Sequence, residues 1–243
     1  MDKDLSFNAG TANFSNTIYV GDNLLSGYTN GGLYASGQEN SIAQILALQF
    51  AQVGGNEVKQ PTFSGNGSGF ISIESYSGGN FTLADVASSS SSTTSMNIFS
   101  CNSDSTLPVY SSFGGSINNY SFPGLKVQEL LVQNIGNVNS DLYNPFLDRV
   151  TSNSGNFIDI INAENPTFFI VAFGLSDVLN RVENGWSCGS SSQELFELNY
   201  DTLVSTLSSK SDKGILCEIP NIEKLPYLNA NYISTQGIYI QAK

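Results

Sequence analysis

The chain has 243 residues, enough for one α/β domain with a sizeable core. It carries 9 Lys and Arg against 21 Asp and Glu, a formal net charge of −12, and contains no histidine. Because nucleic acids and anionic membranes are polyanions, this charge disfavours both as partners. No apolar run approaches the roughly 20 residues that a transmembrane helix needs, so no transmembrane segment is expected.

Charged residues are sparse, and Ser, Asn, Thr and Gly fill much of the chain. This composition is typical of exported or particle-surface proteins, although Met1 to Asp4 lack the features of a secretory signal. Three cysteines, Cys101, Cys188 and Cys217, show no metal-ligand spacing. One disulfide with one free thiol and three buried thiols are both compatible with them. We expect no metal and no cofactor.

The first predicted strand is Ile18-Tyr19-Val20, and the chain turns directly after it at Gly21-Asp22. Ligands and catalytic groups gather at the carboxyl ends of strands in open α/β sheets. A helix follows, with Ser41 and Gln44 at capping-box spacing. Its large apolar residues recur at helical intervals from Ile42 to Val53, and Gly54-Gly55 ends it.

Residues 56–116 are rich in glycine and serine, and they contain one alternating stretch, Phe70 to Glu74. They lack the apolar residues for a core of their own, which predicts a loop or β-ribbon insertion within a single domain spanning 1–243. The later predicted elements, in chain order, are a short helix at 127–134, further helical pattern over 146–161, an apolar strand at 167–173, an amphipathic helix at 193–208, a buried strand at 214–220 and a hairpin at 232–240.

Four blocks occur in a recognisable order: Gly21-Asp22-Asn23-Leu24, Gly124, Gly174-Leu175-Ser176-Asp177, and the segment from Ile215 to Leu228. In this order they resemble the SGNH/GDSL hydrolase family, and the likeness covers nearly the whole chain. The resemblance implies a flavodoxin-like three-layer α/β/α sandwich. It also implies that the chain is truncated at its C-terminus, because the family continues to an Asp-x-x-His block that supplies the base.

In that family the first block supplies a serine nucleophile, and the matching position here is Asn23. The resemblance also places an oxyanion-hole amide at Gly124 and an oxyanion-hole side chain at Ser176. An asparagine amide has no nucleophilic oxygen for acyl transfer, and a chain without histidine lacks the usual base. We therefore expect no intact catalytic set, and a binding site at Asp22, Asn23, Gly124, Ser176 and Asp177.

Two readings of single residues stay open. Ser26 with a neighbouring carboxylate would make a catalytic pair only if burial strongly raised the carboxyl pKa. Asp22 equally suits a structural role, accepting backbone amides at a helix N-terminus.

The aromatic residues Tyr28, Tyr34, Trp186 and Tyr232 are candidates for a carbohydrate- or lipid-facing cleft, or for packing and interface anchors. The predicted function is a binding or structural module, with a surface or virion-like assembly as its setting. The alternative is an acyl-ester hydrolase of the esterase/lipase type, seen as a fragment or in a nucleophile-substituted form. A protein partner or a further copy of the chain is expected to complete the sheet.

Overall fold

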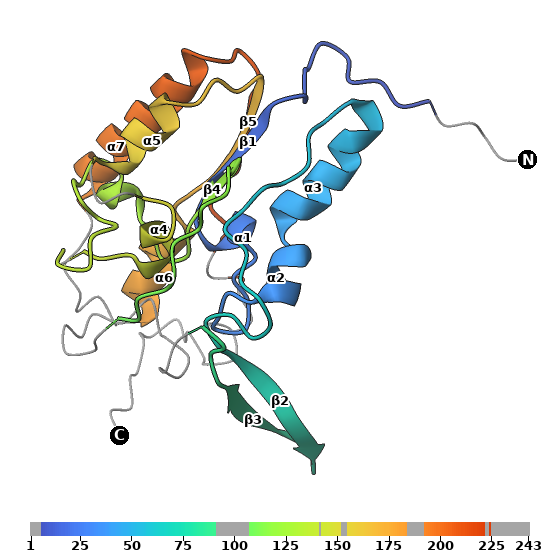
Figure 1. Ribbon diagram of the computed structural model, residues 1–243, viewed down its shortest axis with the longest axis vertical. Helices are drawn as coiled ribbons and strands as arrows, with labels where there is room; N and C mark the ends of the chain where they lie inside the picture. Colours follow the sequence, from blue (N-terminus) through green and yellow to red (C-terminus); the bar gives the residue numbers. More distant parts are fainter. Residues whose placement is uncertain are drawn as a thin grey trace, which may run out of the picture.

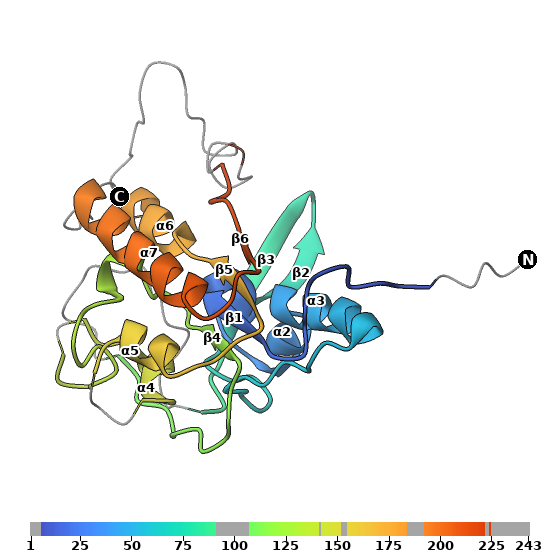
Figure 2. The ribbon, with the colours of Figure 1, turned by 90° about the horizontal axis from the view of Figure 1, so that it is seen from above.

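The computed structural model in Figure 1 describes residues 6–90, 107–140, 142–151, 155–183, 192–221 and 224. Its main sheet is entirely parallel and has the order β4-β1-β5-β6, formed by β1 (Thr17–Gly21), β4 (Asn119–Ser121), β5 (Phe168–Ala172) and β6 (Gly214–Leu216). Helices lie on both sides of this sheet (Figures 1 and 2). The mixed α/β class expected from the sequence is confirmed.

The two central strands, β1 and β5, are buried along their whole length. They pair over five residues, from Thr17 with Phe168 to Gly21 with Ala172. Strands that are covered on both faces have continuous apolar sequences, and this pattern is why β1 and β5 were both predicted correctly.

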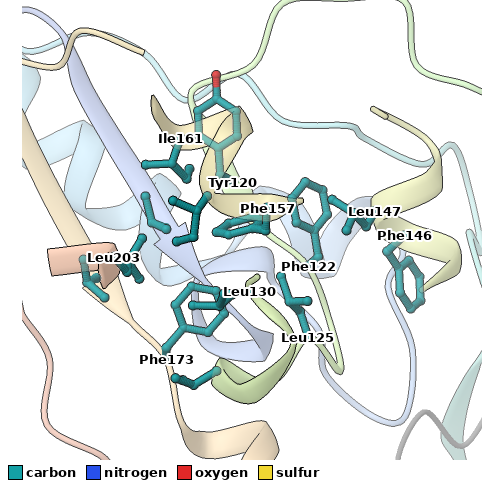
Figure 3. Close-up of a cluster of buried hydrophobic side chains, with 14 of the residues drawn as sticks. Tyr120, Phe122, Leu125, Leu130, Phe146, Leu147, Phe157, Ile161, Phe173 and Leu203 are labelled. Carbon is teal, nitrogen blue, oxygen red and sulfur yellow. The ribbon is translucent and has the colours of Figure 1, made fainter. Parts of the chain in front are cut away.

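One face of the sheet packs against α5 (Phe157–Asn162) and α7 (Gln193–Ser208). Figure 3 shows part of this cluster, in which Phe157 lies among the labelled side chains. The ring of Phe157 meets Phe122 and Phe173 edge-on, with centroid separations of 6.2 Å and 5.8 Å. The amphipathic helix predicted at 193–208 is confirmed, since Leu203 and Leu207 are fully buried in the same cluster.

The opposite face packs against α3 (Ile42–Phe50). Its predicted start is confirmed, because the Ser41 side chain accepts a hydrogen bond from the Gln44 amide at 3.2 Å. On the helix face toward the sheet, Ala43 and Ala47 are buried and Leu46 and Phe50 are half-buried, whereas other large residues of the predicted apolar pattern, such as Ile45, are exposed. Small side chains let the helix approach the sheet closely.

The remaining helices are short: α1 (Asn23–Ser26), α2 (Ala35–Glu39), α4 (Pro145–Asp148), α6 (Leu175–Glu183), and the 3₁₀ turns η1 (Ala51–Val53) and η2 (Val127–Glu129). The helix predicted at 127–134 is therefore only a 3₁₀ turn. The helical pattern over 146–161 is divided between α4 and α5. Each of these two begins at its own capping asparagine, Asn144 and Asn156.

Within 56–116, β2 (Phe70–Ser77) and β3 (Asn80–Val86) form an antiparallel hairpin that pairs with no other strand of the described chain. The hairpin extends away from the body of the molecule (Figures 1 and 2). It begins beside the loop between α1 and α2, where the Ile71 amide donates to the Asn30 carbonyl at 2.7 Å.

The prediction of a buried strand at 214–220 is wrong in extent and burial. β6 has three residues and forms the edge of the described sheet, and Ile215 and Leu216 are 42% and 50% exposed. The half-buried Cys217 that follows is a free thiol. The predicted hairpin at 232–240, Trp186, Tyr232, Cys101 and Cys188 lie outside the described residues.

Candidate functional site

Asn23 is the first residue of α1, directly after β1, and its side chain reaches the loop that follows β4. Its Oδ1 accepts a hydrogen bond of 3.0 Å from the amide nitrogen of Gly124. Gly124 has a φ of 76°, in the left-handed region that favours glycine. The two positions that the family resemblance assigns to a nucleophile and to an oxyanion-hole amide are thus brought together, and they bond to each other.

Asp22 bridges the ends of the two central strands. Its Oδ2 accepts a 2.8 Å hydrogen bond from the amide of Ser176, in the first turn of α6, and the Asp22 amide donates to the Ala172 carbonyl. Asp22 thus accepts a backbone amide at a helix N-terminus, as expected for a structural role, but the helix is α6, because no side-chain capping bond to α1 forms. The carboxylate stabilises the start of α6 instead.

Asp177 holds the loop that carries Gly124. Its Oδ2 accepts a 2.9 Å bond from the amide of Val127, and the Val127 carbonyl accepts a 3.0 Å bond from Asn199 Nδ2 on α7. Both backbone groups of Val127 are therefore bound by buried side chains from two different helices. Asn199 was not among the residues predicted from the sequence, because nothing local to α7 marks it as a contact of η2.

Burial raises the pKa of Asp22 to about 6, against the lowering effect of the hydrogen bond from the Ser176 amide. Burial likewise raises the pKa of Asp177 to about 7, opposed by the Val127 hydrogen bond and increased by the charges of Glu129 and Asp22. Such values are suitable for general acid or base chemistry near neutral pH. Geometry must then decide whether either group can reach a ligand.

Access argues against a catalytic role for these carboxyls. Asp22 and Ser176 are 0% exposed, and Asp177 is 5% exposed. Ser176 Oγ, Asp22 Oδ1 and Asp177 Oδ1 are buried and have no hydrogen-bond partner among the described residues. The Ser176 hydroxyl therefore does not face a ligand surface, contrary to the oxyanion-hole role that the resemblance implies.

Ser26, the other candidate hydroxyl, is already bonded within its own helix. Its Oγ donates to the Asn23 carbonyl at 3.0 Å and accepts from the Tyr28 amide at 3.3 Å, and the residue is 2% exposed. Ser26 therefore has a structural role at the end of α1, where its hydroxyl bonds only to backbone groups among the described hydrogen bonds.

Asn23 is the one residue of the predicted binding set that borders an open groove, of about 500 Å³. Most of the side chains that line this groove carry a hydroxyl or an amide group, and none of the described lining residues is Asp, Glu, Lys or Arg. The lining residues are Asn23, Leu24, Gly27, Tyr28, Thr29, Tyr34, Ser36, Gly37, Asn40, Ser41 and Ile42. The groove thus gathers two of the four aromatic residues named from the sequence.

The two tyrosines contribute differently to this groove. Tyr34 is 9% exposed, its ring is stacked on Phe70 at 4.1 Å, and its hydroxyl accepts from Asn30 at 3.3 Å. Tyr28 is half-buried and packs against the larger core cluster. The polar residues Ser36, Asn40 and Ser41 were missed from the sequence, since only the packing of α2 and α3 beside α1 turns them toward Asn23.

The described residues hold no cluster of three or more His, Cys, Asp or Glu that suits a metal ion. None of the helices in the described ranges has both the length and the apolar character needed to cross a membrane. Comparison with family models, with curated proteins and with solved structures finds no match to this chain.

Proposed function

We propose that this protein is a catalytically degenerate relative of the SGNH/GDSL hydrolases that acts as a binding or structural module, in a surface or particle assembly. The observation that carries the proposal is the hydrogen bond between Asn23 Oδ1 and the Gly124 amide. In an active acyl hydrolase this amide would face the developing oxyanion, and one such donor is worth about 2.7–4 kcal/mol of transition-state stabilisation.

The sheet supports the same proposal. Counted along the chain, its strands stand in the order second, first, third, fourth. This is the order with which the flavodoxin-like sheet begins, and helices cover both faces as in a three-layer sandwich. Asn23 follows the first strand and Ser176 the third, so both lie where the direction of strand order reverses, the place where such folds bind ligands.

The groove beside Asn23 favours an uncharged ligand that carries hydroxyl groups. Its hydroxyl and amide side chains can donate and accept hydrogen bonds, and it offers no charged group for an anionic or cationic ligand. A sugar unit has this chemistry. We test this role by titrating the protein with a panel of neutral sugars and following the backbone NMR signals of Asn23 and Tyr28, with a Tyr28→Ala variant for comparison.

The loss of catalysis is tested with the purified protein, 4-nitrophenyl acetate and a serine-reactive fluorophosphonate. We expect no turnover above the uncatalysed rate and no covalent label. The Asn23→Ser variant is also expected to be inactive, because the described site presents no base to its hydroxyl. Turnover by Asn23→Ser alone would instead establish the nucleophile-substituted hydrolase, and labelling of the unaltered protein would refute the proposal.

A further inference from the structure

The hairpin β2–β3 carries an uncovered apolar face. Register pairs Ile71 with Asp85, Ile73 with Leu83 and Tyr76 with Phe81, so five apolar side chains and the Asp85 carboxylate share one face. The exposed fractions of the apolar residues are 39% for Ile71, 63% for Ile73, 64% for Tyr76, 63% for Phe81 and 61% for Leu83. We call these five residues the ribbon face. Contiguous exposed apolar side chains of this kind mark interaction surfaces.

The ribbon is anchored at its base and unsupported at its tip. Phe70 stacks on Tyr34 at the base, whereas the Tyr76–Phe81 ring pair stands near the turn with a centroid separation of 4.7 Å. A two-stranded hairpin is at best marginally stable in water by itself. A further surface packed on the ribbon face would therefore stabilise it.

A second uncovered apolar surface lies on α3. Ile42, Ile45 and Leu48 are 43%, 52% and 60% exposed, and their spacing places them on one side of the helix, away from the buried Ala43 and Ala47. We call these three residues the α3 stripe. From Asn40 to Asn56 the chain has no charged residue, in a protein of net charge −12. Depletion of charge is the compositional mark of an interface core.

Charge decides which surface suits the ribbon. The ribbon carries two acidic residues, Glu74 and Asp85, and no Lys or Arg. Packing two ribbons against each other would bring four carboxylates together. The exposed leucines of α7 stand among Glu194, Glu197 and Asp201, which would also repel the ribbon. The uncharged α3 stripe presents no such repulsion.

We propose that two copies of this chain associate reciprocally, with the ribbon face of each copy packed on the α3 stripe of the other. Each chain carries both surfaces, so the ribbon face of one copy can pack on the α3 stripe of the other. Twofold symmetry repeats this contact between the second ribbon face and the first α3 stripe. One ribbon contact alone would be small beside the roughly 1,200 Å² that stable interfaces bury, and reciprocity doubles it. This inference does not rest on the proposed function, although Ile42 of the α3 stripe also lines the groove beside Asn23.

The test is sedimentation velocity on the 243-residue chain over a concentration series. We expect a dimer with a dissociation constant below about 100 μM. A ribbon variant, Ile73→Thr with Leu83→Thr, and an α3 variant, Ile45→Gln with Leu48→Gln, should each weaken association at least about tenfold. Both pairs of substitutions keep the local secondary-structure preference, and circular dichroism verifies folding. Leu198→Gln, at an exposed leucine of α7, is the matched control and should leave association unchanged.

Mixing the ribbon variant with the α3 variant distinguishes this arrangement from others. In the mixed dimer the intact ribbon of the α3 variant meets the intact stripe of the ribbon variant, so one of the two contacts is restored and association should exceed that of either variant alone. A monomeric wild type at about 100 μM would overturn the proposal. So would a dimer that responds to the ribbon variant but not to the α3 variant, because that result indicates ribbon-to-ribbon contact.

Discussion

The amide nitrogen of Gly124 donates its hydrogen to Asn23 Oδ1 at 3.0 Å, across 101 residues of sequence. The bond ties the turn after β1 to the loop after β4. Under the proposed relationship to the SGNH/GDSL hydrolases, it also occupies the donor that an active enzyme would direct at its substrate. A single side chain thus satisfies a backbone donor of a loop that is distant in the sequence.

Replacing Asn23 with alanine should destabilise the protein. The substitution removes the acceptor for the Gly124 amide, and a hydrogen bond of this kind contributes about 0.5–1.5 kcal/mol to the free energy of unfolding. The loss is larger if no water molecule takes the place of the acceptor. Urea unfolding followed by circular dichroism measures the loss. The exposed Asn162, at the end of α5, provides the control: Asn162→Ala should change stability by less than about 0.5 kcal/mol. Equal stability of Asn23→Ala and the wild type would contradict the structural role of this bond.

The buried carboxyls predict that stability falls as pH rises. Folding raises the pKa of Asp22 from 3.8 to about 6 and that of Asp177 from 3.8 to about 7. The folded state therefore holds protons that the unfolded state releases. Their stabilising contribution is complete below about pH 4 and is lost as pH rises through the two folded values. Each group adds a slope of up to about 1.4 kcal/mol per pH unit.

Asp22→Asn should flatten this dependence between pH 5 and 8, because the amide keeps an acceptor for Ser176 and carries no proton to release. At pH 8 the variant should be at least as stable as the wild type, since it removes a buried charge. Thermal unfolding at several pH values tests both statements. Asp201→Asn, an exposed site on α7, should leave the slope unchanged, and a wild-type stability that rises from pH 5 to 8 would exclude the explanation.

The two contacts that hold Val127 should be energetically coupled. Asp177→Ala leaves the Val127 amide without its acceptor and should cost about 1–3 kcal/mol. Asn199→Ala removes one of two donors to the Val127 carbonyl, to which the Leu130 amide still donates at 3.2 Å, and should cost about 0.5–1.5 kcal/mol. Because both act on one peptide segment, the double variant should depart from the sum of the single variants by at least about 0.5 kcal/mol. A double-mutant cycle by urea unfolding measures the departure, with the exposed Glu197→Gln as control. Strict additivity would show that the two bonds act independently.

The core cluster in Figure 3 predicts a large effect of one aromatic substitution. Phe157 is fully buried, and Phe157→Ala should cost about 3–5 kcal/mol through lost burial and the cavity left behind. Phe7→Ala is the matched control, because that ring is 60% exposed and belongs to neither surface of the proposed dimer, so its removal should cost far less. Urea unfolding of both variants measures the difference, and equal losses of stability would contradict the burial of Phe157.

Local patterns in the sequence were sufficient for the central elements. β1 and β5 were recognised because strands buried on both faces carry unbroken apolar runs, and the start of α3 because Ser41 caps the helix through a residue three positions away. In each case the deciding interaction lies within a few residues. The mixed α/β class follows from the alternation of these elements along the chain.

Only the tertiary structure decided which side chains meet. The bonds from Gly124 to Asn23 and from Ser176 to Asp22 join residues 101 and 154 positions apart, and no local pattern encodes such a pairing. The spacing of apolar residues in α3 likewise could not show that Ala43 and Ala47 face the sheet while Ile45 is exposed. Which side of the helix faces the sheet depends on how closely the two elements pack. The sequence by itself determined that a serine nucleophile is absent from position 23 and histidine from the whole chain. Chain packing determined that Asn23 occupies the Gly124 amide, because that contact depends on two loops brought together by the sheet.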